Sequence, residues 1–203
     1  MSQPPARPDA FHWWIDAVGG YLTFTRDRVQ IGNIGNPRND VAIMGDLSSQ
    51  HVELLREAQG WVLIAHSETA VNGRTGSSFL LKDGDTITMR SVEWVFRQPL
   101  PWSRTARLEI TSPHRLPMGM DGVLLLSDTC VLSDGKGAHI QTPWETPVAI
   151  TWHRGQYWLR GPGDLLIDGK MHQGWGPLGE SSLVRASWGS FRFEPGRNAR
   201  RPS

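Results

Sequence analysis

The sequence has few of the features that mark secreted, membrane or nucleic-acid-binding proteins. Its single cysteine, Cys130, excludes an intramolecular disulfide and favours a reducing compartment. No run of about 18 apolar residues is present, so no transmembrane helix is predicted, and Met1 to Phe11 lacks the apolar segment of a signal peptide. With 21 basic and 20 acidic residues, the net charge of +1 gives no reason to expect nucleic acid or a membrane surface as partner. We therefore expect a cytoplasmic protein.

The usual patterns of catalysis and metal binding are also missing from the sequence. We find no Gly-x-Ser-x-Gly, no His-Glu-x-x-His and no glycine-rich phosphate loop preceding a helix. No Cys and His spacing matches a structural zinc site, and the seven histidines are scattered. Asp83 and Asp85 flank a turn and are interpreted as turn formers, not as an acid and base pair. We expect no enzyme, no catalytic residue, no metal and no cofactor.

What the sequence does contain is a succession of short apolar runs. Turn-forming residues interrupt them about every 8 to 12 residues, which is typical of a β-sandwich or barrel. Several runs alternate apolar with polar residues, so one face of each strand is expected to be buried. The ten tryptophans are interpreted as core residues rather than as a platform for sugars or bases. In the first half the predicted strands are Tyr21 to Thr25, Arg28 to Ile31, Val41 to Ile43, His51 to Glu57, Trp61 to Ala65, Ala70 to Asn72, Thr86 to Met89 and Val92 to Arg97.

The two halves of the chain echo one another, with a junction near residue 100. Two prolines within Gln98 to Ser103 interrupt strand pairing and indicate a boundary there. Trp61 and Trp158 lie 97 residues apart in matching contexts, and Phe96 and Phe193 repeat that offset. We therefore predict two tandem all-β sandwiches of mainly antiparallel strands. The expected divisions are a flexible N-terminus at 1–12, domains at 13–100 and 101–196, and a flexible C-terminus at 197–203.

Residues 28 to 98 resemble the forkhead-associated (FHA) family, whose β-sandwich binds phosphothreonine peptides. The resemblance rests on five ordered segments, which keep the order and spacing of the family pattern. They are Ile31-Gly32-Asn33, Asp40-Val41, Ser48-Ser49-Gln50-His51, Ala65-His66-Ser67-Glu68-Thr69-Ala70-Val71-Asn72-Gly73 and Leu81-Lys82-Asp83-Gly84-Asp85.

The resemblance implies a phosphopeptide site formed by Asn33, Arg38, Ser48, Ser49, His66 and Ser67. The family has an arginine where this chain has Asn33, and an amide cannot replace a guanidinium against a phosphate. Arg38, in the same loop, either supplies the missing cation or is an exposed loop charge. Ser48 matches the serine whose hydroxyl binds the phosphate, and Ser49 follows it. His66 and Ser67 stand where the family contacts the peptide.

Four further residues match positions that the resemblance implies are structural. His51 corresponds to a histidine that ties neighbouring loops together by hydrogen bonds. Gly32 precedes the site loop, and Asn72-Gly73 suits a hairpin turn with positive φ angles.

The second half keeps the β pattern but loses the site segments, since the Ser-Arg-x-His position falls near Trp144 to Pro147. We expect it to be a degenerate FHA-like copy. Two functions remain open. The first is an adaptor that reads phosphothreonine on a phosphorylated protein in Ser/Thr kinase signalling. The second is a phospho-independent scaffold in which both domains bind protein partners or each other. The oligomeric state is not predicted.

Overall fold

The computed structural model describes residues 7–196, which form twenty β-strands and one short 3-10 helix, η1 (Pro117–Gly119). The predicted all-β fold class is therefore confirmed. In chain order the strands are β1 (Ala10–Ile15), β2 (Gly19–Phe24), β3 (Arg28–Asn33), β4 (Val41–Ile43), β5 (Val52–Glu57), β6 (Gly60–Ala65), β7 (Ala70–Val71), β8 (Arg74–Thr75), β9 (Ser78–Leu80), β10 (Thr86–Met89), β11 (Val92–Arg97), β12 (Ala106–Ile110), β13 (Gly122–Leu125), β14 (Thr129–Ser133), β15 (Ile140–Gln141), β16 (Val148–His153), β17 (Gln156–Ile167), β18 (Lys170–Leu178), β19 (Leu183–Ala186) and β20 (Gly189–Pro195).

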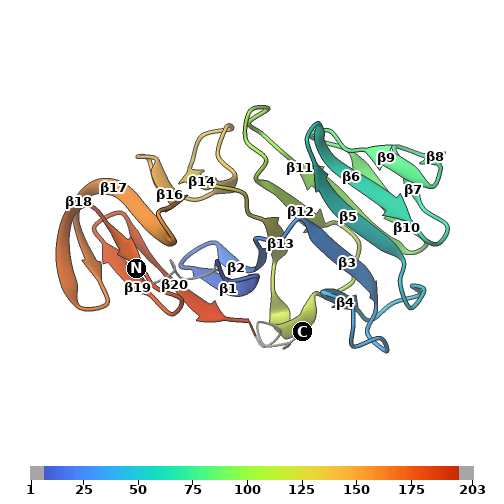
Figure 1. Cartoon of the computed structure of the whole chain (residues 1–203), viewed down its shortest axis with the longest axis horizontal. Helices are drawn as coiled ribbons and strands as arrows, with labels where there is room; N and C mark the ends of the chain where they lie inside the picture. The colour runs from blue at the N-terminus through green and yellow to red at the C-terminus, as the bar shows by residue number, and fades with distance from the viewer. Residues whose placement is uncertain (1–6, 197–203) are drawn as a thin grey trace.

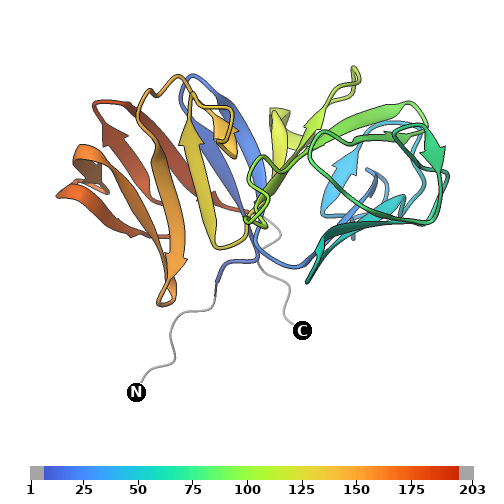
Figure 2. The ribbon, with the colours of Figure 1, turned by 90° about the horizontal axis from the view of Figure 1, so that it is seen from above.

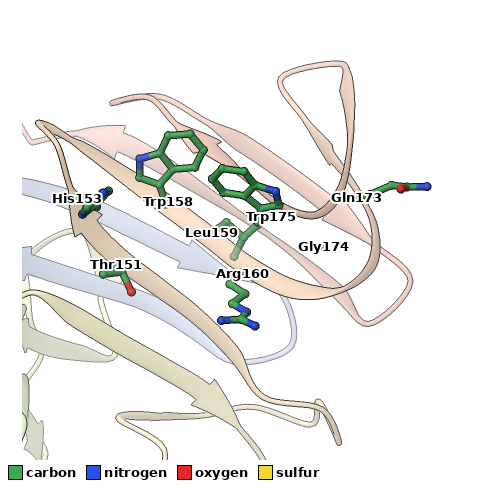
Figure 3. A pocket seen from close by; sticks show the side chains of 8 residues that line it. All are labelled: Thr151, His153, Trp158, Leu159, Arg160, Gln173, Gly174 and Trp175. Atoms are coloured by element: carbon green, nitrogen blue, oxygen red, sulfur yellow. The ribbon is translucent and has the colours of Figure 1, made fainter.

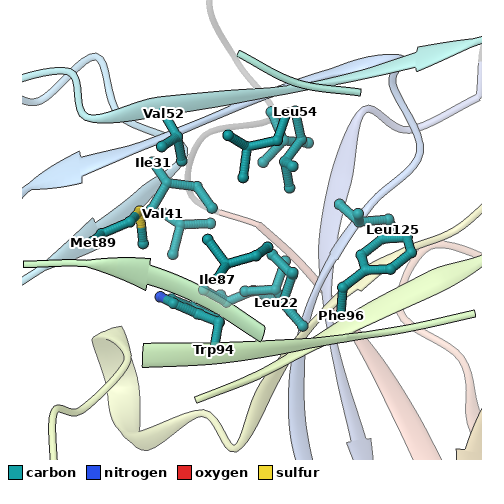
Figure 4. Packing of buried hydrophobic residues seen from close by; sticks show 14 of the residues in the cluster. Leu22, Ile31, Val41, Val52, Leu54, Ile87, Met89, Trp94, Phe96 and Leu125 are labelled. Atoms are coloured by element: carbon teal, nitrogen blue, oxygen red, sulfur yellow. The ribbon is translucent and has the colours of Figure 1, made fainter. Parts of the chain in front are cut away.

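The strands form two lobes side by side, each built from facing layers (Figures 1 and 2). In the first lobe a five-stranded sheet, ordered β4-β3-β5-β6-β9, packs against strands β7, β10 and β11 of a larger sheet. The alternation in β11 buries Val92, Trp94 and Phe96 and leaves Glu93 exposed. Figure 4 shows these layers meeting, with Ile31 and Leu54 from one sheet opposite Ile87 and Trp94 from the other.

In the second lobe the long strand β17 connects the two layers. Its register shifts between Arg160 and Asp164, an irregularity of the kind that bends a strand. The first part of β17 pairs with β16, and the last part pairs with β19. The core between the layers is strongly aromatic, with Trp13, Phe191 and Phe193 all at most 2% exposed.

The lobes exchange strands at their centre. β1 forms a hairpin with β2 but pairs on its other side with β20, near the end of the chain. In the same way β12 forms a hairpin with β13 and pairs on its other side with β11 of the first lobe. The two hairpins meet because β2 and β13 run parallel to each other. One fifteen-stranded sheet therefore passes through both lobes.

The central strands contribute side chains to both cores. In β13, Val123 and Leu125 lie in the first core, whereas Leu124 and the following Leu126 lie in the second. Trp13 of β1 belongs to the second core although it is close in sequence to strands of the first. The two cores thus lie on opposite faces of the shared strands, as the period of two requires.

The predicted strands of the first half agree with the structure, and Val41–Ile43, Thr86–Met89 and Val92–Arg97 have the same bounds. The flexible N-terminus was placed too far along the chain, because residues 10–12 already belong to β1. Arg7 is also anchored, since its Nε donates to Tyr157 Oη at 2.9 Å. Residues 1–6 and the predicted flexible segment 197–203 lie outside the described residues. The division into domains at residue 100 stays a prediction, and strand pairing crosses it.

Candidate functional site

The predicted site residues fall on three loops at one end of the first lobe. These are the β3–β4 loop at 34–40, the β4–β5 loop at 44–51 and the β6–β7 loop at 66–69. Asn33, the last residue of β3, donates its backbone N–H to the Ser48 carbonyl at 3.0 Å. Since such bonds join the loops to one another, short segments far apart in sequence form one surface.

His51 holds two of these loops together. The backbone N–H of Ser48 donates to His51 Nδ1 at 3.1 Å, so the proton of a neutral ring lies on Nε2. That Nε2 donates to the Glu68 carbonyl at 3.0 Å. The side chain is fully buried, and burial lowers the pKa of His51 below its ordinary value. His51 is therefore in a position to stiffen the site and is inaccessible to a ligand.

The side-chain amide of Asn33 is hydrogen-bonded to the neighbouring loops. Its Nδ2 donates to the Gly45 carbonyl at 3.0 Å, and its Oδ1 accepts from the backbone N–H of Gly35 at 2.8 Å. These two bonds connect the end of β3 with both neighbouring loops. The amide at this position thus has a structural use and carries no charge for a phosphate.

Two asparagines that the sequence analysis did not single out complete this network. Asn39, 4% exposed, donates through Nδ2 to the carbonyls of Asn33 and Ser49, both at 2.8 Å. Asn36 donates to the same Ser49 carbonyl at 3.1 Å. A Cβ at Gly32 would lie only 2.5 Å from Ser49 O and 2.7 Å from Asn39 Nδ2, so the amide reaches its place because residue 32 is glycine. The sequence signal that could have identified Asn36 and Asn39 is the presence of three asparagines within residues 33–39.

A pair of hydrogen-bonded hydroxyl groups lies at this surface. Ser67 Oγ donates to Ser48 Oγ at 2.6 Å, which brings the β4–β5 and β6–β7 loops into contact. Both serines are half-buried, and neighbouring Ser49 is exposed. Hydroxyl groups rotate and both donate and accept, so the pair can turn its protons toward an incoming anion.

The charges on and beside the loops of the site are mixed. Arg38 is exposed, and among residues 7–196 its guanidinium forms no ion pair. Arg90 contributes a second cation near His51, but Asp46 of the β4–β5 loop binds it at 3.0 Å. His66 lies beside Glu53, with Nε2 3.9 Å from Oε2, and no hydrogen bond within the described residues joins it to the serine pair. Arg38 is thus the more available cation.

Asn72 and Gly73 form the tight turn between β7 and β8, with φ angles of 52° and 76°. Asn72 also bonds to the next strand, since its Oδ1 accepts from the Thr86 N–H at 3.0 Å. Its Nδ2 donates to Asp85 at 2.8 Å. These contacts give both residues a structural role in the turn.

A second buried histidine, His139, contacts a serine but cannot act as a base toward it. Its Nδ1 accepts from the Val131 N–H at 2.9 Å, so the proton of the neutral ring lies on Nε2 and is donated to Ser103 Oγ, 2.8 Å away. Burial, with a smaller contribution from the Arg107 charge, lowers the pKa of His139 to about 4. Ser103 therefore accepts a hydrogen bond here and is not activated as a nucleophile.

Within residues 7–196 no group of three or more His, Cys, Asp or Glu side chains is arranged to hold a metal ion. No helix in the same part of the chain has the length and apolar character needed to cross a membrane.

No protein-family model matches the sequence, and no curated protein matches it. Similarity is found among solved structures. Two of them are FHA domains. The second FHA domain of the Mycobacterium tuberculosis ABC transporter Rv1747 is 24% identical with a TM-score of 0.36, over 44% of this chain and 79% of that one. The FHA structure of Rv0020c is 22% identical with a TM-score of 0.34, over 43% and 91% of the two chains. Mycobacterium tuberculosis EmbR, in complex with a low-affinity phosphopeptide, is 22% identical with a TM-score of 0.34, over 43% of this chain and 24% of EmbR.

Proposed function

We propose that the protein is a non-catalytic interaction module that binds phosphothreonine peptides at the loops of its first lobe. The observation that carries this proposal is the Ser48–Ser67 hydroxyl pair, 2.6 Å apart and held by the buried His51. This pair joins two loops whose residues resemble the FHA pattern. The proposal includes a cytoplasmic role in Ser/Thr kinase signalling.

In this proposal the phosphate displaces the hydrogen bond between the serines and receives one from each. Arg38 supplies the charge that Asn33 cannot, because a guanidinium forms strong charge-assisted bonds with a phosphate. Asn33 and Asn39 keep the loops in place, so the hydroxyl groups need little ordering when the peptide arrives. Ser49 and His66 border this surface and contact the peptide outside the phosphate.

Calorimetric titration of the full chain tests the proposal. A phosphothreonine peptide library is compared with phosphoserine and unphosphorylated libraries of the same composition. The full chain is needed because β12 and β13, which complete the first lobe, lie beyond residue 100. Saturable binding of the phosphothreonine library alone is the expected result.

Two variants and one control connect the binding to these residues. Ser48→Ala and Arg38→Ala should each weaken binding about tenfold, since a hydrogen bond to a charged group contributes about 1.5 to 3 kcal/mol. Ser181→Ala, on an exposed residue of the second lobe, should leave affinity unchanged. Equal binding of all three libraries, or no effect of Ser48→Ala, would contradict phosphothreonine recognition.

A phospho-independent scaffold is the second candidate, and two observations favour it. Asn33 already makes two loop bonds, and the exposed Asp46 carboxylate adds negative charge next to the surface that would receive a phosphate. If none of the three libraries bound and the chain captured one defined partner regardless of its phosphorylation, the scaffold would be established in place of the adaptor.

We also propose that the second half is a degenerate copy of the first. Supporting it, the hydrogen bond from Asn33 N to Ser48 O has a counterpart from Asp134 N to Trp144 O, and the turn at Asn72 has one at Asp168, with φ of 49°. Trp144 is 4% exposed and packs on Trp188 with ring centroids 4.7 Å apart. A buried indole would thus replace the phosphate-binding serine, which leaves this copy for packing or contact with another protein.

A further inference from the structure

A shallow pocket of about 480 Å³ lies on the outer face of the second lobe, remote in sequence from the serine pair. Strands β16, β17 and β18 form its floor. Two tryptophans, Trp158 and Trp175, line its centre. Their rings stack with centroids 4.7 Å apart and an angle of 24° between the ring planes. In Figure 3 Arg160 extends beneath this pair, and His153 and Gln173 lie at opposite ends.

The aromatic pair does not belong to the core. In the first part of β17 Tyr157 and Leu159 are buried, so Trp158 and Arg160 face the other side of the sheet. Trp175 is 61% exposed. The interpretation of all ten tryptophans as core is therefore wrong for Trp175, as it is for the exposed Trp102. Since an indole gains most when its apolar faces leave water, an uncovered ring in a pocket is suited to a ligand with a flat apolar face.

The polar side chains of the pocket surround this ring. Thr151, His153 and Gln173 each carry groups that both donate and accept hydrogen bonds. Arg160 is paired across the strands with Trp175 and is exposed, and no ion pair of its guanidinium occurs within residues 7–196. The pocket therefore combines one stacking surface, several hydrogen-bonding side chains and one arginine without a counter-charge.

We propose that this pocket binds a pyranose sugar that carries a carboxylate, as one unit of an acidic oligosaccharide. The apolar C–H face of the ring stacks on Trp175, the ring hydroxyls reach the hydrogen-bonding side chains around it, and the carboxylate pairs with Arg160. Two other occupants fit less well. A nucleotide phosphate favours several cations or a helix N-terminus, whereas a single arginine is present here. A proline-rich peptide needs a groove between aromatic rings, and these two rings are closed against each other.

Nuclear magnetic resonance titration of the full chain tests this proposal. The indole N–H signals of a ¹⁵N-labelled sample are followed with a glucuronate-containing disaccharide, with the neutral glucose disaccharide of the same linkage, with adenosine monophosphate and with a proline-rich peptide. Additions up to about 20 mM detect a Kd near 1 mM. The acidic disaccharide should shift the Trp158 and Trp175 signals and bind about tenfold more tightly than the neutral one.

Three variants separate the parts of the pocket. Trp175→Ala should reduce affinity for the acidic sugar at least tenfold. Arg160→Gln should bring the acidic and neutral sugars to equal affinity. Trp102→Ala removes another exposed tryptophan, 82% accessible and outside the pocket, and should change nothing.

Several results would overturn the proposal: no shift of the two signals with either sugar, equal affinity of the two sugars for the unaltered chain, or tighter binding of the nucleotide or the peptide. Because Arg160→Gln alters only an exposed side chain, it keeps the test decisive if Trp175→Ala is poorly folded.

Discussion

Replacing Trp13 with alanine should loosen the second lobe, although residue 13 precedes every strand of the first. The Trp13 side chain is fully buried in the second core. Its ring meets Phe191 and Phe193 edge to face, with centroids 5.6 Å and 5.2 Å away. The consequence of the substitution is thus set by the strand exchange and not by distance along the chain.

The expected loss of unfolding free energy is about 3 kcal/mol. Truncating a buried tryptophan to alanine usually costs about 3 to 5 kcal/mol through lost burial and the remaining cavity. The two edge-to-face contacts add to this loss. The Trp13 Nε1–H makes the loss smaller, because this buried donor has no hydrogen-bond partner within the described residues. Its burial costs the folded state about 1 to 3 kcal/mol, and the substitution removes that cost. The net loss of about 3 kcal/mol is a substantial fraction of the free energy of unfolding of an ordinary domain.

Urea denaturation gives the total loss, and native-state hydrogen exchange shows where it occurs. Protection should fall first in β19, β20 and β17. Trp61→Ala is the matched control, because Trp61 is equally buried but belongs to the first core, and it should act first on β5 and β6. If Trp13→Ala loosened β3, β5 and β6 and left β19 and β20 protected, the exchange of strands would be refuted.

Three further predictions address other parts of the molecule. The fragment 1–100 lacks β12 and β13 and should show no native-like amide dispersion; a dispersed spectrum would contradict the shared sheet. The pKa of His139 falls from 6.5 to about 4 on folding, so only the unfolded chain gains this proton between those values. Stability should therefore fall as the pH drops from 6.5 to 4, by up to about 3 kcal/mol, and His139→Gln should flatten this dependence in denaturation curves. Asp46→Asn should strengthen phosphopeptide binding up to about fivefold in titrations by freeing Arg90, whereas weaker binding would contradict this account.

The strands of the first lobe were predictable because their signals are local. The alternation in Val92–Arg97 and the turn residues that bound Thr86–Met89 determine both strands without knowledge of their partners. The all-β class follows from the same evidence. β8 and β9 were missed because each has only two or three residues and is largely exposed.

β1 was not among the predicted strands, and its partner was not predictable from local signals. β1 and β12 both precede a strand of their own hairpin, and either could extend the edge of β11 or of β20. The alternation of Phe11, Trp13 and Ile15 indicates a buried face but not which core buries it. Pairing between strands so far apart in sequence depends on the whole fold.

The candidate site divides similarly between local and distant information. The resemblance identified Ser48, Ser67 and His51, which the structure brings together through hydrogen bonds. It could not indicate that the Asn33 amide would be used by Gly35 and Gly45, because both bonds depend on the path of the loops.

The sequence did contain one sign of the shared sheet, in the segment Val123–Leu126. Four consecutive apolar residues do not alternate, and such a run is typical of a strand that is buried on both faces. All four are indeed fully buried, two in each core. A strand with this composition cannot be left at the surface of either lobe alone, because separation would expose two apolar side chains at about 1.5 to 3 kcal/mol each. The two cores therefore stabilise each other through β13.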